Sequence, residues 1–256
     1  MSRGEPILRI ETLSKSFGGL RAVSDLSFDV AAGTITSLIG GNGAGKTTAF
    51  NLITGNLAPD AGRITFRGTR VDGLPPHKVA RAGIARGFQE LRLFNRLTAL
   101  DNVETAVPGQ LGEGIIHSLI GGRRMRAERL ATRAHATALL GELTIAEHAA
   151  ALAERLSYGQ QKLVALARLV AAEGELLLLD EPTSGLSPAM VEDFCARMRR
   201  LTDAGKTILL IEHNVEIVMR LSDWIVVMHQ GGKIAEGTPE AVRSDVAVMH
   251  AYLGIS

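Results

Sequence analysis

Residues 40–47 have the types and spacing of a phosphate-binding loop. They read Gly-Gly-Asn-Gly-Ala-Gly-Lys-Thr, which fits the pattern G-x-x-x-x-G-K-[ST]. An apolar run precedes them and a helical run follows, which is the context that this pattern requires. Glycines let backbone N–H groups point at phosphate oxygens, and the helix start adds the positive end of its dipole. We expect Lys46 to bind the β- and γ-phosphates and Thr47 to hold Mg²⁺. The other expected nucleotide ligands are Gly40, Asn42, Gly43, Ala44, Gly45 and Thr48.

Two adjacent acidic residues follow a run of four leucines over residues 176–179. Asp180, at the carboxyl end of this predicted strand, can reach Mg²⁺, whereas Glu181 can face the γ-phosphate and polarise the attacking water. Adjacent acidic residues in a loop are often only solvated. Here, however, a buried strand leads directly into the pair, which favours a functional role. The two motifs together predict a nucleoside triphosphatase, and they do not by themselves exclude a GTPase.

Residues 156–161 read Leu-Ser-Tyr-Gly-Gln-Gln, and here the sequence resembles the ABC ATPase family, whose signature is Leu-Ser-Gly-Gly-Gln. The resemblance extends nearly end to end, from Leu13 to Gly254. It implies a Mg²⁺-dependent ATPase that works as a dimer, in which Ser157 and Gly159 of one subunit contact the γ-phosphate held by the other. A serine hydroxyl, a glycine N–H and a following helix N-terminus suit an anion.

The resemblance implies roles for four further residues. Gln89 matches the glutamine that joins a helical subdomain to the core and senses Mg²⁺ and the γ-phosphate, and His213 matches the switch histidine at the γ-phosphate. Phe17 matches the aromatic residue that stacks on adenine, with Val23 packed beside it. Such stacking contributes roughly 1–3 kcal/mol. The alternative for Phe17 is an ordinary place in the core.

Four positions depart from the family pattern. Gly41 stands where proline is common, Tyr158 replaces the first signature glycine, and Leu163 stands where arginine is usual. Ser187 replaces an aspartate that contacts the partner across the dimer, and Ser187 before Pro188 instead suits the start of a helix.

The signature, the long insertion over residues 108–133, the Ile-Glu-His-Asn stretch at 211–214 and the closing Ala-Tyr-Leu-Gly look like the ATPases of branched-chain amino-acid importers and their urea and amide relatives. This resemblance implies a second ATPase subunit, identical or different, transmembrane permease subunits and, indirectly, a solute-binding protein. One alternative is the motor of an exporter, such as lipopolysaccharide extraction. Another is an ABC ATPase with no transport role, although such proteins carry paired cassettes or long coiled coils.

The resemblance implies a protein held at the inner face of the membrane by its partners, and the sequence itself favours a cytoplasmic location. The chain has 28 basic and 27 acidic residues, so its charge gives no reason to expect nucleic acid as a partner. Residues 1–11 lack the apolar run of a secretory signal, and the aliphatic runs at 176–179 and 208–211 are far shorter than the ~20 residues that span a bilayer.

The elements that must position these residues indicate an α/β fold. Alternating apolar residues at 7–13, 27–30 and 63–66 predict an N-terminal antiparallel β subdomain. Apolar runs at 34–39, 176–179, 207–211 and 225–228, with a helix over 188–205, predict a mostly parallel sheet. We therefore predict a core over residues 1–87, an inserted helical subdomain over 88–167 and a return to the core over 168–256, which is the P-loop ABC ATPase arrangement.

Overall fold

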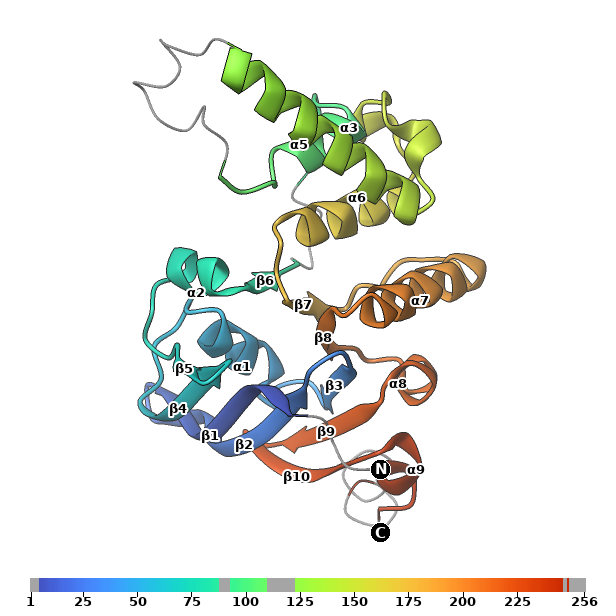
Figure 1. Ribbon diagram of the computed structural model, residues 1–256. Coiled ribbons are helices and arrows are strands. Elements are labelled where there is room, and N and C mark those ends of the chain that lie inside the picture. The colour runs from blue at the N-terminus through green and yellow to red at the C-terminus, as the bar shows by residue number, and fades with distance from the viewer. Residues whose placement is uncertain (1–4, 88–92, 110–122, 246–247, 249–256) are drawn as a thin grey trace. The chain divides into compact units, whose positions relative to one another are not determined.

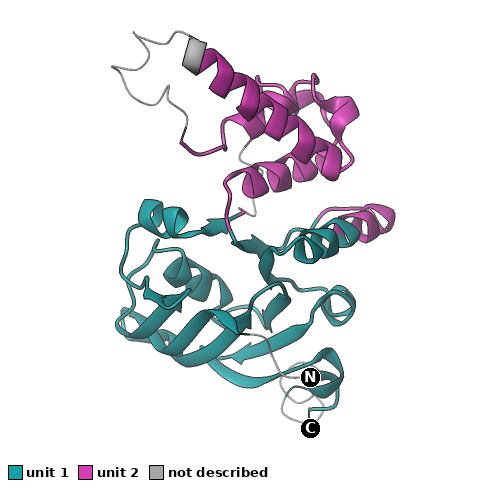
Figure 2. Cartoon of the chain, in the orientation of Figure 1, with its two compact units in different colours: residues 1–86, 175–184, 195–256 teal, residues 87–174, 185–194 magenta. Residues whose placement is uncertain are grey.

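The computed structural model describes residues 5–87, 93–109, 123–245 and 248 (Figure 1). The chain divides into two compact units, residues 1–86, 175–184 and 195–256 in the first and residues 87–174 and 185–194 in the second (Figure 2). The expected boundary at residue 167 falls inside α6 (Tyr158–Ala171), a continuous helix, and the second unit extends to residue 174. Gln89 and the closing stretch at 251–254 lie outside the described residues.

The first unit contains the predicted antiparallel sheet. Its strands lie in the order β2-β1-β4-β5 and comprise β1 (Pro6–Phe17), β2 (Leu20–Ala31), β4 (Ala61–Phe66) and β5 (Thr69–Arg70). Register shifts interrupt the pairing of β1 with β2 at several points, so the two long strands bend around the core.

The second sheet of this unit positions the site, because the site residues follow the carboxyl ends of its strands. Its order is β10-β9-β3-β8-β7-β6, and every strand is parallel to its neighbours except β10. The strands are β3 (Ile35–Gly40), β6 (Ile84–Arg86), β7 (Leu176–Asp180), β8 (Thr207–Ile211), β9 (Trp224–His229) and β10 (Gly232–Gly237). All residues of β3, β7 and β8 are buried, which confirms the apolar-run prediction.

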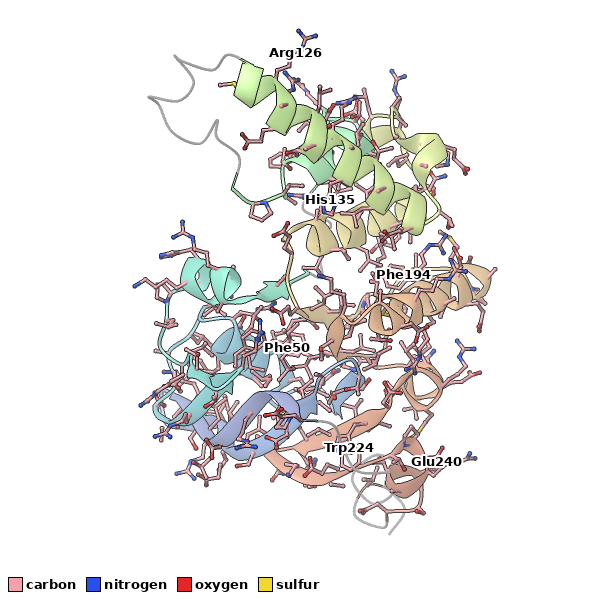
Figure 3. The ribbon with its side chains drawn as sticks, viewed as in Figure 1. Phe50, Arg126, His135, Phe194, Trp224 and Glu240 are labelled. Carbon is pink, nitrogen blue, oxygen red and sulfur yellow. The ribbon has the colours of Figure 1, made fainter. Side chains whose placement is uncertain are left out.

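Helices cover the sheets and complete the core. They are α1 (Lys46–Ile53), α2 (Pro76–Ala82), α8 (Val215–Leu221), α9 (Pro239–Arg243) and the later part of α7 (Pro188–Asp203). One hydrophobic cluster contains buried residues of both sheets and the apolar face of α1, with Phe50 fully buried (Figure 3). This packing holds the start of α1, and the loop before it, against the carboxyl ends of the parallel strands.

The second unit is helical, as predicted. It contains α3 (Ala99–Glu104), α5 (Arg123–Glu142), the short helices η2 (Ala146–His148) and η3 (Ala153–Arg155), α6 and the start of α7. The helices α3, α5 and α6 contact one another. None of the helices in the described ranges is long and apolar enough to cross a bilayer.

Candidate nucleotide-binding and hydrolysis site

The phosphate loop has a backbone that only glycine adopts without strain. Gly43 and Gly45 have φ angles of 79° and 97°, in the left-handed region. Space is limiting as well, because a Cβ at Gly45 would lie 2.3 Å from the Ala22 carbonyl oxygen and one at Gly40 would lie 2.4 Å from that of Met228. The neighbouring strands β2 and β9 therefore hold the loop so closely that a side chain at either position would displace it.

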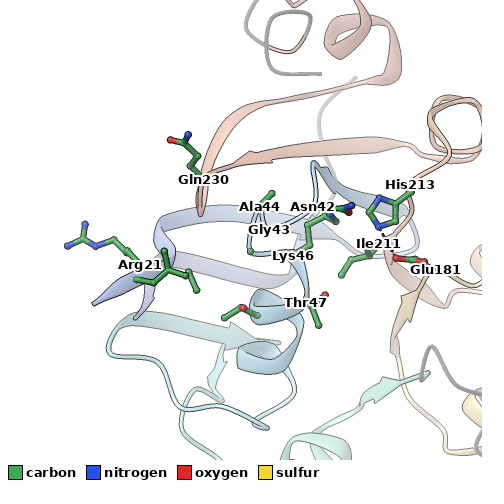
Figure 4. Close-up of a pocket in the computed structure, with 14 residues that line it drawn as sticks. Arg21, Asn42, Gly43, Ala44, Lys46, Thr47, Glu181, Ile211, His213 and Gln230 are labelled. Atoms are coloured by element: carbon green, nitrogen blue, oxygen red, sulfur yellow. Dashed lines mark ion pairs between the residues drawn. The ribbon is translucent and has the colours of Figure 1, made fainter. Parts of the chain in front are cut away.

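A cavity of about 670 Å³ opens over this loop in the first unit (Figure 4). It is lined by loop and helix residues 42–48 together with Glu181 after β7 and His213 after β8. Five residues that we did not predict complete the lining: Leu20, Arg21, Ala22, Ile211 and Gln230. Arg21 and Gln230 lie at the opposite end of the pocket from Glu181 and His213 (Figure 4).

Lys46 is buried at the start of α1, with its ammonium turned onto the loop. Its Nζ donates hydrogen bonds to the carbonyl oxygens of Gly40 and Gly41, at 2.8 and 3.0 Å. Burial lowers the pKa of this lysine, and the nearby Glu181 and Asp180 carboxylates oppose that shift. The loop thus holds one cation over its own backbone, where it can bind phosphate oxygens.

Asp180 is buried at the carboxyl end of β7, and burial raises the pKa of its carboxyl group. Arg86 opposes that shift, with its Nη2 3.5 Å from Asp180 Oδ2. The same guanidinium donates to Asn51 Oδ1 at 2.5 Å and lies over the Phe50 ring, 5.8 Å from its centroid. Arg86 therefore joins Asp180 to α1, a role that the sequence analysis missed because β6 spans only three residues.

The side chains of Glu181 and His213 contact each other at the mouth of the pocket, with 2.8 Å between Glu181 Oε1 and His213 Nε2 (Figure 4). Glu181 has a φ of 47°, which is uncommon for a residue with a side chain. Its N–H donates to the carbonyl oxygen of Ile211 at 2.9 Å, so the end of β8 holds this turn. Strained residues of this kind cluster at functional sites.

Glu212 holds the loops that carry Glu181 and His213. The sequence analysis did not identify this role. Its side chain is 4% exposed and accepts hydrogen bonds from the Thr183 hydroxyl and, at 2.8 Å, from the His213 N–H. One buried carboxylate thus joins the loop after β7 to the loop after β8. An acidic residue directly before the histidine was the only available sign of this role.

The two residues expected at the adenine, Phe17 and Val23, differ in their exposure to solvent. Phe17 is 45% exposed at the end of β1, and Lys15 Nζ lies 5.7 Å from its ring centroid. Val23 differs from the prediction, because its side chain is fully buried in the hydrophobic core. The residues just before it on β2, Leu20, Arg21 and Ala22, line the pocket instead.

The signature residues lie in the second unit, at the start of α6. Ser157 is exposed and caps the helix, with its Oγ accepting from the Gln160 N–H at 3.3 Å. Gly159 is buried, and a Cβ at this position would collide with the Met190 side chain. The exposed Tyr158 ring packs against Gly185, and Lys162 Nζ lies 5.2 Å from its centroid. An exposed hydroxyl at a capped helix start is suited to bind an anion.

Residues 23–184 match the family described as "ABC transporter", and residues 233–255 match the one described as "Branched-chain amino acid ATP-binding cassette transporter". The chain is 40% identical to the high-affinity branched-chain amino acid transport ATP-binding protein BraF of Pseudomonas aeruginosa, over 99% of each chain. It is 39% identical to LivG of Escherichia coli, which has the same description, over 98% of each. Among solved structures, an ATP-binding cassette of an ABC transporter in its ADP conformation superimposes with a TM-score of 0.83 at 32% identity, covering 98% of this chain and 100% of that one.

Proposed function

We propose, from the premise that this chain belongs to the ABC transporter family, that it hydrolyses ATP to drive the import of branched-chain amino acids, or of a related small amide, through separate membrane subunits. The observation that supports ATP hydrolysis is that the phosphate loop and the proposed catalytic residues line the same pocket. In it, Lys46 of the phosphate loop and the contacting side chains of Glu181 and His213 line one cavity. The importer part is supported by the similarity to BraF and LivG over nearly the whole chain.

In this proposal, residues in and beside the pocket perform the steps of phosphoryl transfer to water. Lys46 and the loop N–H groups bind the phosphates, and Glu181 accepts a proton from the attacking water. His213, already hydrogen-bonded to Glu181, orients that carboxylate and reaches toward the γ-phosphate. The Thr47 hydroxyl and the Asp180 carboxylate are hard oxygen donors that suit Mg²⁺. Mg²⁺ is octahedral and usually keeps several waters, so nucleotide phosphates and water would complete its shell.

A second subunit completes the site in this proposal. Ser157 Oγ uses a lone pair to accept from the Gln160 N–H, which leaves its own O–H free to donate to a γ-phosphate oxygen. Dimer closure on ATP would therefore be favoured by the nucleotide's higher affinity for the closed state. The dimer of this chain could include an identical or a different partner subunit.

Replacing Ser157 by arginine should block MgATP-dependent dimerisation and leave ATP binding unchanged, because the large side chain obstructs a site that belongs to the other subunit. Ultracentrifugation in MgATP and nucleotide titration measure the two effects separately. Loss of both would show that Ser157 acts on the nucleotide of its own chain. The control is Ser244→Arg, at the C-terminal end of α9 in the first unit.

Phe94 is the residue that we propose contacts a membrane subunit, through a short cytoplasmic helix of that subunit. Its side chain is 52% exposed, with the Arg168 guanidinium 5.1 Å from the ring centroid. The backbone beneath it is rigid, because the Asn102 side chain accepts from the Phe94 N–H at 2.9 Å and donates to its carbonyl oxygen at 3.1 Å. An exposed ring on a fixed backbone is suited to serve as an anchor in an interface. Leu93 is partly buried beside it, and Gln89, whose movement would shift the docked helix, lies outside the described residues.

Replacing Phe94 by alanine should leave the ATPase activity of the isolated subunit nearly unchanged, weaken its assembly with the membrane subunits and abolish transport. The assay is reconstitution of the purified complex in vesicles, with the ATPase rate measured as solute-binding protein loaded with leucine is added. Stimulation of the parent complex by the loaded protein tests the importer assignment itself. Leu130→Ala, which removes a 62% exposed side chain from α5, is the matched control. Unfolding of the Phe94 variant, or loss of its basal ATPase activity, would show that Phe94 stabilises the subunit itself and that the docking site lies elsewhere.

A further inference from the structure

The helix start that carries Ser157 is capped by Gln160 of the signature, and the Gln160 side chain contacts a residue outside the signature, His148. Gln160 closes a capping box, in which its Oε1 accepts from the Ser157 N–H at 2.8 Å and its own N–H donates to Ser157 Oγ. The other end of the same side-chain amide, Nε2, lies 2.7 Å from His148 Nε2. His148 and Gln160 are both partly buried, and all three residues belong to the second unit.

The hydrogen-bonding pattern determines which of the two ring nitrogens of neutral His148 carries the proton. Since Gln160 Oε1 is used by the Ser157 N–H, the group that faces His148 is the NH₂, which only donates. His148 Nε2 must therefore accept, and the imidazole proton must lie on Nδ1. Glu147 Oε1 lies 3.6 Å from the same ring nitrogen, which is too far for a hydrogen bond.

His148 can position Gln160 because its own backbone is fixed. Its N–H donates to the Ile145 carbonyl oxygen at 3.1 Å, and its carbonyl oxygen accepts from Ala151 at 2.9 Å. The flanking residues are bonded to the start of α3, with Leu100 donating to Ala149 at 3.0 Å and Ala99 to Ala151 at 2.9 Å. The acceptor therefore sits on a segment with little freedom to move.

We infer that His148 is a positioning residue for the signature: neutral His148, accepting through Nε2, holds the Gln160 amide in the one orientation that caps α6 and presents Ser157. Without this acceptor the Gln160 amide is free to rotate, and the Ser157 backbone loses its partner. The inference rests on the proposed role of Ser157 in closing the dimer.

His148→Lys, which places a donor at this point, should raise the dissociation constant of the MgATP dimer by about three- to tenfold, the effect of one lost hydrogen bond. His148→Gln, whose Oε1 can occupy the place of the ring nitrogen, should restore the value to within about twofold. Both variants are made in the hydrolysis-deficient Glu181→Gln chain and compared by ultracentrifugation. ATP affinity should not change in either, because the phosphate loop belongs to the other unit. His77→Ala, on an exposed position of α2, is the control.

The tautomer supplies a test that needs no variant and that packing alone would not affect. In ¹⁵N-labelled wild-type protein, long-range ¹H–¹⁵N correlation spectra should show neutral His148 with its proton on Nδ1. A proton on Nε2 would overturn the inference. Equal dissociation constants for the His148→Lys variant, the His148→Gln variant and their Glu181→Gln parent chain would also overturn it. If the parent chain does not dimerise in MgATP, the proposed function fails, and the tautomer still decides whether His148 orients Gln160.

Discussion

Replacing Lys46 by alanine should lower the affinity for ATP by about 10²-fold or more, because each charge-assisted hydrogen bond contributes about 1.5–3 kcal/mol and two phosphates lose theirs. The ammonium already lies over the loop, bonded to the carbonyl oxygens of Gly40 and Gly41, so it needs little movement to reach the phosphates. No backbone N–H of the loop carries a full charge that could replace it. Isothermal titration with MgATP measures the change directly.

Two controls separate this effect from a loss of structure. The variant should unfold at nearly the same temperature as the parent chain, since α1 is held by the buried apolar side chains of Phe50, Leu52 and Ile53. Lys78→Ala, an exposed lysine of α2, should bind ATP normally. Undiminished affinity in a folded Lys46→Ala chain would mean that the loop does not hold the nucleotide phosphates.

Replacing Glu181 by glutamine should reduce ATP turnover by about 10²–10⁴-fold, the usual contribution of a general base, with ATP affinity retained. Glutamine is nearly the same shape and can keep a hydrogen bond to His213 Nε2, which now lies 2.8 Å from the Glu181 carboxylate. The variant therefore tests proton acceptance more than geometry. Phosphate release under saturating MgATP measures turnover, and Glu216→Gln in α8 is the control for loss of a surface carboxylate.

The same Glu181 variant should accumulate as an ATP-bound dimer, because closure needs ATP and reopening needs hydrolysis. The parent chain without nucleotide should be largely monomeric. A monomeric Glu181→Gln chain at saturating MgATP, observed by size-exclusion chromatography or ultracentrifugation, would contradict the proposed dimer cycle. Full turnover in that variant would instead remove Glu181 from the role of base.

The sequence by itself determined the features that depend on neighbours along the chain. The phosphate loop is one, since the glycines, Lys46 and Thr47 all lie within eight residues whose backbone needs left-handed turns before a helix. The buried strands β3, β7 and β8 are another, because continuous apolar runs are buried on both faces of a parallel sheet. The position of Glu181 after a buried strand predicted that it faces the γ-phosphate, and the family resemblance implied the same for His213.

Only the tertiary structure decided the contacts between residues that are remote in sequence. Arg86 reaches Asp180 because the short edge strand β6 pairs with β7, and three residues give no readable periodicity. Glu212 joins two loops that are distant along the chain, and Gln160 meets His148 only because η2 lies beside the start of α6. Val23 is buried in the core, whereas Leu20, Arg21 and Ala22 before it on β2 line the pocket. Such contacts depend on strand register and helix packing, which are properties of the folded chain as a whole.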